Sequence, residues 1–206
     1  MEDLCKLSLE EFCKRLGDAT PTPGGGAAGA VAASLASSLA KMVAGLTLGK
    51  KGYEEYESEM ERIIEEMEER TLKLHEFVNE DVAAFDAVME AFKLPKGEER
   101  KAAIQNALKK AAEVPYEVAR CARNIIQELE ALAEWGNKNA LSDVASSAHL
   151  ALAAFKVAVE NVQINLRSIK DEEFVKKFQE EIEELKAQID GSYKRVLKTV
   201  EERLMG

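Results

Sequence analysis

The chain has 206 residues, of which 46% are hydrophobic and 32% are charged, and its formal net charge is −10. Residues 1–206 are expected to form a single helical domain, because this length suits one domain with its own core and long tracts of Ala, Glu, Lys and Leu contain only four prolines. The negative charge and the lack of a Lys/Arg cluster argue against a protein that binds nucleic acid.

The N-terminus has neither a basic region nor an apolar run, and no stretch reaches about 18 uninterrupted apolar residues. We therefore expect a cytoplasmic protein that does not insert into a membrane. Cys5, Cys13 and Cys121 have unrelated spacings and no paired Cys or His nearby. This pattern argues against a disulfide framework and against a zinc site, so no metal is expected.

Ser8 followed by Glu11 is the signature of a capping box and predicts a short amphipathic helix that ends near Gly17. Residues 20–26, Thr-Pro-Thr-Pro-Gly-Gly-Gly, then interrupt the helical pattern. The prolines restrict this segment and the glycines permit close approach of another group, so it predicts a shaped loop whose free N–H groups suit an anion. It lacks the Gly-Lys-Ser/Thr ending of a P-loop and the strand that precedes a dinucleotide site, so ATP and NAD are not expected as cofactors.

Residues 26–48 are mostly Ala, Gly, Ser, Val and Leu, with Lys41 as the only charge. This composition predicts a helix that is surrounded by protein on nearly every side and that lets its neighbours approach closely. Residues 53–92 keep apolar residues at helical spacing, which predicts a long amphipathic helix. Such a helix would span roughly 60 Å, more than the width of a compact domain of this size, so a homodimer is expected.

A turn at residues 94–97 leads into a helical tract that ends near Glu134, with a kink expected at Pro115. Ser142 is expected to cap the next helix, which is rich in Ala and Val. Asp171 begins a last, strongly charged helix. The sequence thus predicts an all-α, single-domain bundle of about six helices, two of them buried.

Asp81 lies inside the apolar stripe of the long helix, together with Leu74, Val78 and Phe85. Burial disfavours the charged form of a carboxyl group and raises its pKa, which lets an acid exchange protons closer to neutral pH. Asp81 is therefore a candidate acid or base. The alternative is a structural hydrogen-bond acceptor, which is the more frequent role for a lone Asp on an apolar stripe.

A polar segment leads into the start of the Ala/Val-rich helix, where Asp143 falls in the first turn. The helix dipole by itself accounts for an Asp at this position. Asn161 lies about five turns later on the same face and Asn165 one turn further, and we expect both amides to link helices or subunits. His75 and His149 have no sequence-local acid or serine in a triad arrangement, so nucleophilic catalysis is not indicated.

Four motifs follow one another in a fixed order along the chain. They are Pro21-Thr22-Pro23-Gly24-Gly25-Gly26, Leu46-Thr47 with Gly49-Lys50-Lys51, Asn139-Ala140-Leu141-Ser142-Asp143, and Asn161-Val162-Gln163-Ile164-Asn165-Leu166. Each motif is weak alone, but the ordered set is specific and resembles the cyclodeaminase/cyclohydrolase family over residues 7–204. That family includes the C-terminal domain of formiminotransferase-cyclodeaminase and stand-alone bacterial methenyltetrahydrofolate cyclohydrolases.

The resemblance implies an all-helical homodimer that binds a tetrahydrofolate derivative near the glycine-rich loop, without metal or nucleotide. The implied activity is that of formimidoyltetrahydrofolate cyclodeaminase, in which N10 attacks the formimino carbon, closes a ring and expels ammonia. Asp81 and Asp143 are then expected to share the proton transfers. The substrate-binding residues expected on this basis are Thr22, Pro23, Gly24, Gly25, Gly26, Asn139 and Ser142.

Two other functions remain open at this point. Methenyltetrahydrofolate cyclohydrolase is the alternative activity, in which water attacks the methenyl carbon in the same cleft and the ring opens to a formyl product. The sequence separates these two activities poorly. A non-catalytic helical scaffold is the second alternative, and it accounts for the helices but not for the glycine-rich loop, Asp81 or the ordered motifs.

Overall fold

Six α-helices make up most of the chain in the computed structural model, which describes residues 2–205. Met1 and Gly206, the outermost residues of the expected domain, lie outside this range. No strand is present between residues 2 and 205, so the predicted all-α class and the predicted number of helices are confirmed. The helices are α1 (Leu9–Gly17), α2 (Gly25–Thr47), α3 (Glu57–Lys93), α4 (Glu98–Trp135), α5 (Leu141–Leu166) and α6 (Glu172–Met205).

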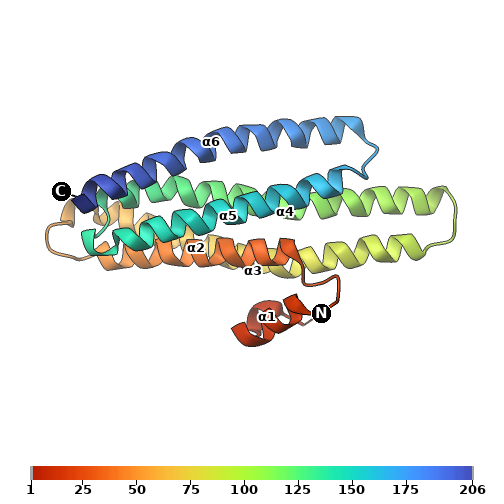
Figure 1. Cartoon of the computed structure of the whole chain (residues 1–206), viewed down its shortest axis with the longest axis horizontal. Coiled ribbons are helices and arrows are strands. Elements are labelled where there is room, and N and C mark those ends of the chain that lie inside the picture. The colour runs from red at the N-terminus through yellow and green to blue at the C-terminus, as the bar shows by residue number, and fades with distance from the viewer. Residues whose placement is uncertain (1, 206) are drawn as a thin grey trace.

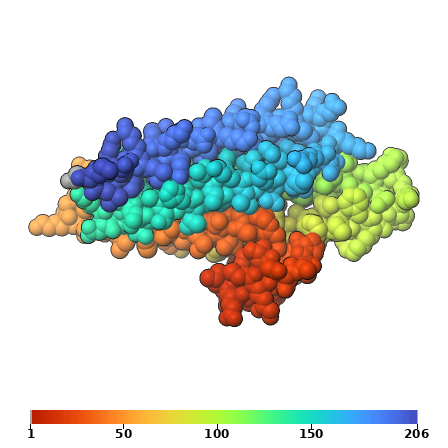
Figure 2. All heavy atoms as spheres, viewed as in Figure 1, coloured from red at the N-terminus to blue at the C-terminus, as the bar shows by residue number. Residues whose placement is uncertain are grey.

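The long helices α2 to α5 lie side by side in a bundle, and α6 packs against α4 and α5 (Figure 1). In the space-filling view α5 lies between α6 and α2, and α1 projects from the side of the bundle (Figure 2). Helix α2 packs against α3, α4 and α5, while one side of α2 is not covered by another helix within residues 2–205.

The small residues of α2 form the centre of the bundle, as the composition predicted. Ala33, Ala36, Ala40 and Ala44 are fully buried, and the carbonyl oxygen of Ala36 accepts a hydrogen bond from Ser147 of α5 at 2.7 Å. By length and composition α2 could cross a membrane, but 56% of its most apolar stretch is buried inside the structure. This burial against α3 and α5 is that of a core helix.

The ends of α1 and α6 follow the sequence signals. The side chain of Ser8 accepts a hydrogen bond from the N–H of Glu11 at 3.1 Å, and Asp171 accepts one from the N–H of Phe174 at 3.1 Å. Both residues therefore cap the helices that they were expected to begin. The long helix α4 continues through Pro115 as one helix of 38 residues.

The start of α5 differs from the prediction. Ala140 takes the N-cap position without a side-chain hydrogen bond, so the expectation that Ser142 caps this helix is wrong. The physical reason is a 3-10 turn, η3 (Lys138–Ala140), that runs directly into α5 and moves the cap upstream. Asn137 is the cap of this turn, since its side chain accepts a hydrogen bond from the backbone N–H of Asn139. The backbone N–H of Asn137 donates to Oγ1 of Thr47 at 2.8 Å, which ties the turn to the end of α2.

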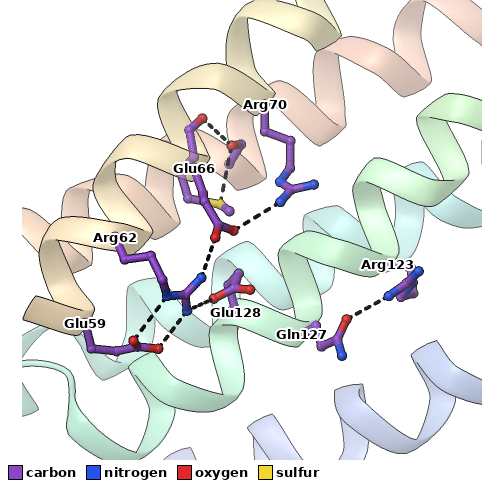
Figure 3. Close-up of polar contacts among 9 residues, drawn as sticks. Glu59, Arg62, Glu66, Arg70, Arg123, Gln127 and Glu128 are labelled. Atoms are coloured by element: carbon purple, nitrogen blue, oxygen red, sulfur yellow. Dashed lines mark hydrogen bonds and ion pairs between the residues drawn. The ribbon is translucent and has the colours of Figure 1, made fainter.

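A network of ion pairs joins α3 to α4 on the outside of the bundle (Figure 3). Arg62 donates hydrogen bonds to Glu59 and Glu66 on its own helix. It also donates to Glu128 of α4, and Arg70 contacts Glu66 at 3.4 Å. These side chains are partly exposed, so each pair stabilises the fold only modestly, but together they connect the two longest helices.

Candidate active site

A cleft of about 300 Å³ lies where the glycine-rich loop meets α3, α4 and α5. Of the residues expected to bind substrate, Thr22, Gly24, Gly25 and Gly26 line this cleft, whereas Pro23 lines a neighbouring hollow beside α1. The remaining wall is formed by Pro21, Asp81, Ala84, Phe85, Val88, Ala111, Asn161, Ile164 and Asn165. A largely apolar lining with a few convergent polar groups is typical of a small-molecule site.

This cleft is not the largest on the molecule. A cleft of about 670 Å³ lies at the start of α4, with Lys101, Gln105 and Lys170 in its wall, and one of about 420 Å³ lies between α5 and α6. Neither contains a residue that the sequence singled out as catalytic or substrate-binding. The residues expected to act on a substrate therefore favour the smaller cleft at the glycine-rich loop.

Asp81 is tied to the first turn of α2. Its Oδ2 accepts a hydrogen bond from the backbone N–H of Ala27 at 3.0 Å, so the carboxyl group faces the free N–H groups at the start of this helix. Burial raises the pKa of Asp81 above its ordinary value, while the hydrogen bond from Ala27 acts in the opposite direction. The half-buried carboxyl group thus has the raised pKa that its place in the apolar stripe predicted.

The glycines of the loop make this approach possible. A Cβ atom at Gly26 would overlap the carboxyl group of Asp81. A Cβ atom at Gly25 would lie 3.4 Å from Nδ2 of Asn161, so this position faces α5 and not α3. Gly26 therefore allows the carboxyl contact, and Gly25 allows the loop to lie against the amide.

Asn161 and Asn165 complete the polar lining of the cleft. Asn165 donates a hydrogen bond to the carbonyl oxygen of Ala111 on α4 at 2.8 Å, which is the helix link expected from the sequence. Asn161 donates to the carbonyl oxygen of Val157 at 2.8 Å. Within residues 2–205 neither side-chain oxygen accepts a hydrogen bond, so both are available to a ligand.

Sequence reasoning gave these two amides a structural role only and did not place Phe85 in the cleft. Their spacing, one turn apart on an otherwise apolar helix, was the available signal. It was insufficient because periodicity identifies a face of α5 without showing which segment of the chain covers that face.

The structure does not bring Asp143 to Asp81 within one chain. Asp143 lies in the first turn of α5, whereas the last turns of this helix line the cleft. Asn161 follows Asp143 by 18 residues, which is about 27 Å along the helix axis. Asn139 and Ser142 precede Asp143, so they too lie far from the cleft. The expected sharing of proton transfers by two carboxyl groups therefore fails inside a single chain.

These distant residues belong to a second polar group, here called the far-end cluster. It contains Lys50, Lys51 and Lys138 together with Asn137, Asn139, Ser142 and Asp143. The Nζ atom of Lys50 donates a hydrogen bond to the side chain of Asn137, and Asn137 donates to the carbonyl oxygen of Leu46 at 2.9 Å. The motif that follows α2 and the motif that precedes α5 thus meet at the end of the bundle opposite the cleft.

A serine–histidine pair lies between α2 and α3. Oγ of Ser34 is 2.9 Å from Nε2 of His75, a contact across 41 positions of sequence that the absence of a sequence-local partner did not predict. Ser34 is buried, with 7% of its surface exposed. No carboxylate within residues 2–205 bonds the other ring nitrogen, so the pair lacks the third member of a catalytic triad.

The chain is similar to known proteins over nearly its whole length. Residues 8–184 match the family model described as Formiminotransferase-cyclodeaminase. A methenyltetrahydrofolate cyclohydrolase from Methylorubrum extorquens is 37% identical over 202 residues, which cover 96% of this chain and 97% of that relative. A formimidoyltransferase-cyclodeaminase from Mus musculus is 32% identical over 207 residues, and the match covers 98% of this chain but 38% of that longer relative.

The fold is shared with a solved structure. The crystal structure of a formiminotetrahydrofolate cyclodeaminase from Thermotoga maritima, at 2.80 Å resolution, matches with a TM-score of 0.92 and 49% sequence identity. The match covers 97% of this chain and 98% of the other.

The substitution Gly26→Ala tests the close approach of Asp81 to α2. The added methyl group overlaps the carboxyl group, so we expect destabilisation of about 1–3 kcal/mol, measured by urea unfolding. Gly17→Ala is the matched control, because its added methyl group meets nothing within 4 Å and should change stability by less than about 0.5 kcal/mol. Equal stability of Gly26→Ala and the unmodified chain would contradict the close approach.

The pH dependence of stability tests the environment of Asp81. Because its pKa in the folded state lies above the ordinary value of 3.8, the folded chain binds the proton more tightly than the unfolded chain. This stabilisation is complete below the ordinary value and is lost as the pH rises through the raised pKa. The free energy of unfolding, compared with that of Asp81→Asn, should therefore fall across this window and then level off. A difference that rises with pH would show that the carboxylate is stabilised and not desolvated.

Proposed function

Because the chain belongs to the formiminotransferase-cyclodeaminase family, we propose that it is a tetrahydrofolate one-carbon enzyme with formimidoyltetrahydrofolate cyclodeaminase activity. The 49% identity to the cyclodeaminase from Thermotoga maritima, over nearly all of both chains, favours this reaction. The observation that carries the proposal is the carboxyl group of Asp81, which lies in the cleft against the start of α2 with a raised pKa. A scaffold would need no such group.

A single carboxyl group can serve both proton transfers of this reaction. N10 of the folate attacks the formimino carbon on N5, the five-membered ring closes, and the bond from that carbon to the departing nitrogen breaks. The formimino group reacts in its protonated form. Asp81 as a carboxylate accepts the proton that N10 loses, and as an acid it then donates the same proton to the departing nitrogen, which leaves as ammonia while the methenyl bridge keeps the positive charge. The sequence of steps needs no second carboxyl group from the same chain, and Asp143 is too distant to supply one.

The cleft offers complementary groups to the rest of the pterin. Thr22 and the backbone of residues 24–26 line one part, and the free side-chain oxygens of Asn161 and Asn165 are acceptors for the N–H groups of the ring. Phe85 provides apolar surface for the ring face. These contacts hold the reacting nitrogen near Asp81, which lowers the entropic cost of the proton transfer.

The proposal includes a cytoplasmic homodimer that needs neither metal nor nucleotide. Proton transfer by a carboxyl group is sufficient for the reaction, and residues 2–205 contain no group of three or more His, Cys, Asp or Glu side chains placed to hold a metal ion. A second chain is supported by the length of α3, which has 37 residues, and by the side of α2 that no other helix within residues 2–205 covers.

Methenyltetrahydrofolate cyclohydrolase is the second candidate activity. It is favoured by the relative from Methylorubrum extorquens, which carries that name and matches along 97% of its length. In the same cleft Asp81 would accept a proton from the water that attacks the methenyl carbon.

Two incubations separate these activities by the near-ultraviolet absorbance of the methenyl bridge. One starts from 5-formimidoyltetrahydrofolate and the other from 5,10-methenyltetrahydrofolate, each with a blank without enzyme. Appearance of absorbance in the first identifies a cyclodeaminase. Faster loss in the second alone identifies a cyclohydrolase, and no change in either refutes both.

Asp81→Asn is expected to lower turnover by a factor of about 10² to 10⁴ while the fold persists, because the amide accepts the hydrogen bond from Ala27 but cannot transfer the proton. Circular dichroism and urea unfolding check the fold. Asp86→Asn, at an exposed carboxyl group on the same helix, is the control and should keep full turnover. Undiminished turnover of Asp81→Asn would exclude the role given to this residue.

A further inference from the structure

The apolar stripe of α3 continues beyond the helix that covers it. Upstream of Asp81 this stripe packs under α2, and Leu74 and Val78 are fully buried there. Helix α2 runs antiparallel to α3 and begins beside Asp81, so it does not extend over the last turns of α3. The same face continues there as three apolar residues. We call them the open stripe, and they are Phe85, Val88 and Phe92.

The open stripe leads from the cleft toward the turn between α3 and α4. At this end the two helices extend past the rest of the bundle (Figure 1). Two members of the open stripe line the cleft, and Phe92 lies one turn further, with 47% of its surface exposed. The charged residues Asp86, Glu90 and Lys93 lie on the other side of the helix. An exposed aromatic ring at the end of an uncharged track suits a flat apolar group of a ligand.

Arg100 lies at the outer end of the open stripe. Its Nε atom donates a hydrogen bond to the carbonyl oxygen of Phe92 at 3.1 Å. Its guanidinium group lies 5.9 Å from the centre of the Phe92 ring. Among residues 2–205 its Nη1 and Nη2 atoms have no hydrogen-bond or ion-pair partner. A guanidinium group that is fixed through Nε presents these two nitrogens side by side, which suits a carboxylate.

The tail of a tetrahydrofolate derivative has the matching chemistry. An aminobenzoyl group on N10 is followed by at least one glutamate, whose carboxylates need cationic partners when they leave water. The cleft itself has no Lys or Arg among its lining residues. The site around Asp81 is therefore incomplete for this substrate class without a cation from outside the cleft.

The length of the open stripe also matches this tail. Phe92 follows Asp81 by 11 residues, which is about 16 Å along α3. The extended tail covers roughly 12 Å from N10 to its last carboxylate. With contacts of about 3 Å at each end, it reaches from Asp81 to Arg100.

We propose that the outer part of the open stripe and Arg100 bind the aminobenzoylglutamate tail of the folate. The aminobenzoyl ring lies against Val88 and Phe92, and Arg100 binds a glutamate carboxylate. This assignment rests on the proposed function, because a folate substrate supplies the tail. Another cation, Arg15, lines the neighbouring hollow beside α1, but Glu2 and Glu11 already pair with it. Arg100 is the cation to which the uncharged face of α3 leads.

The first experiment compares two substrates that differ only in the tail. One is the folate that the unmodified chain converts, with one glutamate, and the other is its pteroyl amide analogue, which lacks the glutamate. Arg100→Gln removes the charge, while its amide nitrogen takes the place of Nε and keeps the hydrogen bond to Phe92. We expect KM for the glutamate form to rise by a factor of about 10 with kcat little changed. KM for the amide analogue should stay the same.

The matched control is Lys93→Gln, which removes a positive charge from the other side of α3, where Lys93 pairs with Glu90. It should leave both KM values unchanged. A purely structural role of Arg100 at the last turn of α3 would alter both substrates alike and lower the stability in urea unfolding. Equal effects of Arg100→Gln on the two substrates, or no effect on either, overturn the proposal.

The second experiment tests the aromatic contact. Phe92→Ala should raise KM for both substrates by a factor of about 3 to 10, because both keep the aminobenzoyl ring. The carbonyl group that Arg100 contacts belongs to the backbone and remains in this variant. Leu94→Ala, at an exposed leucine in the turn after α3, is the control and should change neither KM. An unchanged KM in Phe92→Ala overturns the proposal.

A binding measurement keeps this result distinct from the proposed function. If the unmodified chain converts neither folate, the proposed function fails. Equilibrium binding of 5-formyltetrahydrofolate, which carries the same tail, then decides about the tail site. Binding to Arg100→Gln that is about tenfold weaker than to the unmodified chain supports the proposal. Equal affinity, or no binding to either chain, overturns it.

Discussion

The hydrogen bond from the N–H of Ala27 to the carboxyl group of Asp81 is the contact on which the candidate site depends. It joins α3 to the first turn of α2 and places a carboxyl group of raised pKa beside the glycine-rich loop. The contact requires the absence of a side chain at Gly26, because a Cβ atom there would overlap the carboxyl group. One glycine thus connects the packing of two helices to the chemistry of the cleft.

A bundle of long helices imposes a separation on the functional residues. The glycine-rich loop and Asn161 lie together at one end of α2 and α5, and Thr47 and Asn137 lie together at the other end. Because a helix rises about 1.5 Å per residue, the two ends of each helix lie roughly 30 Å or more apart. One cleft in a single chain therefore includes the residues of only one end.

Several parts of the fold and site could be predicted from the sequence because they depend on local patterns. The composition of α2, the caps at Ser8 and Asp171, and the place of Asp81 in an apolar stripe all follow from residues within a few turns of one another. The predicted cap at Ser142 was wrong because η3 continues into α5 and leaves Asn137 as the capping residue. The sequence still identified the segment in which α5 begins, and only the capping residue differed.

The sequence by itself determined the helices, the half-buried carboxyl group and the family to which the chain belongs, since periodicity, composition and ordered motifs are properties of the linear chain. Only the tertiary structure decided which of the motif residues share a site. Asn161 and Asn165 of α5 join Asp81 of α3 in the cleft. Asp143 also lies on α5, but it is about five turns away from Asn161. The physical reason is that a repeating pattern fixes the face on which a residue lies, while the packing of rigid helices fixes the distance between residues on different helices.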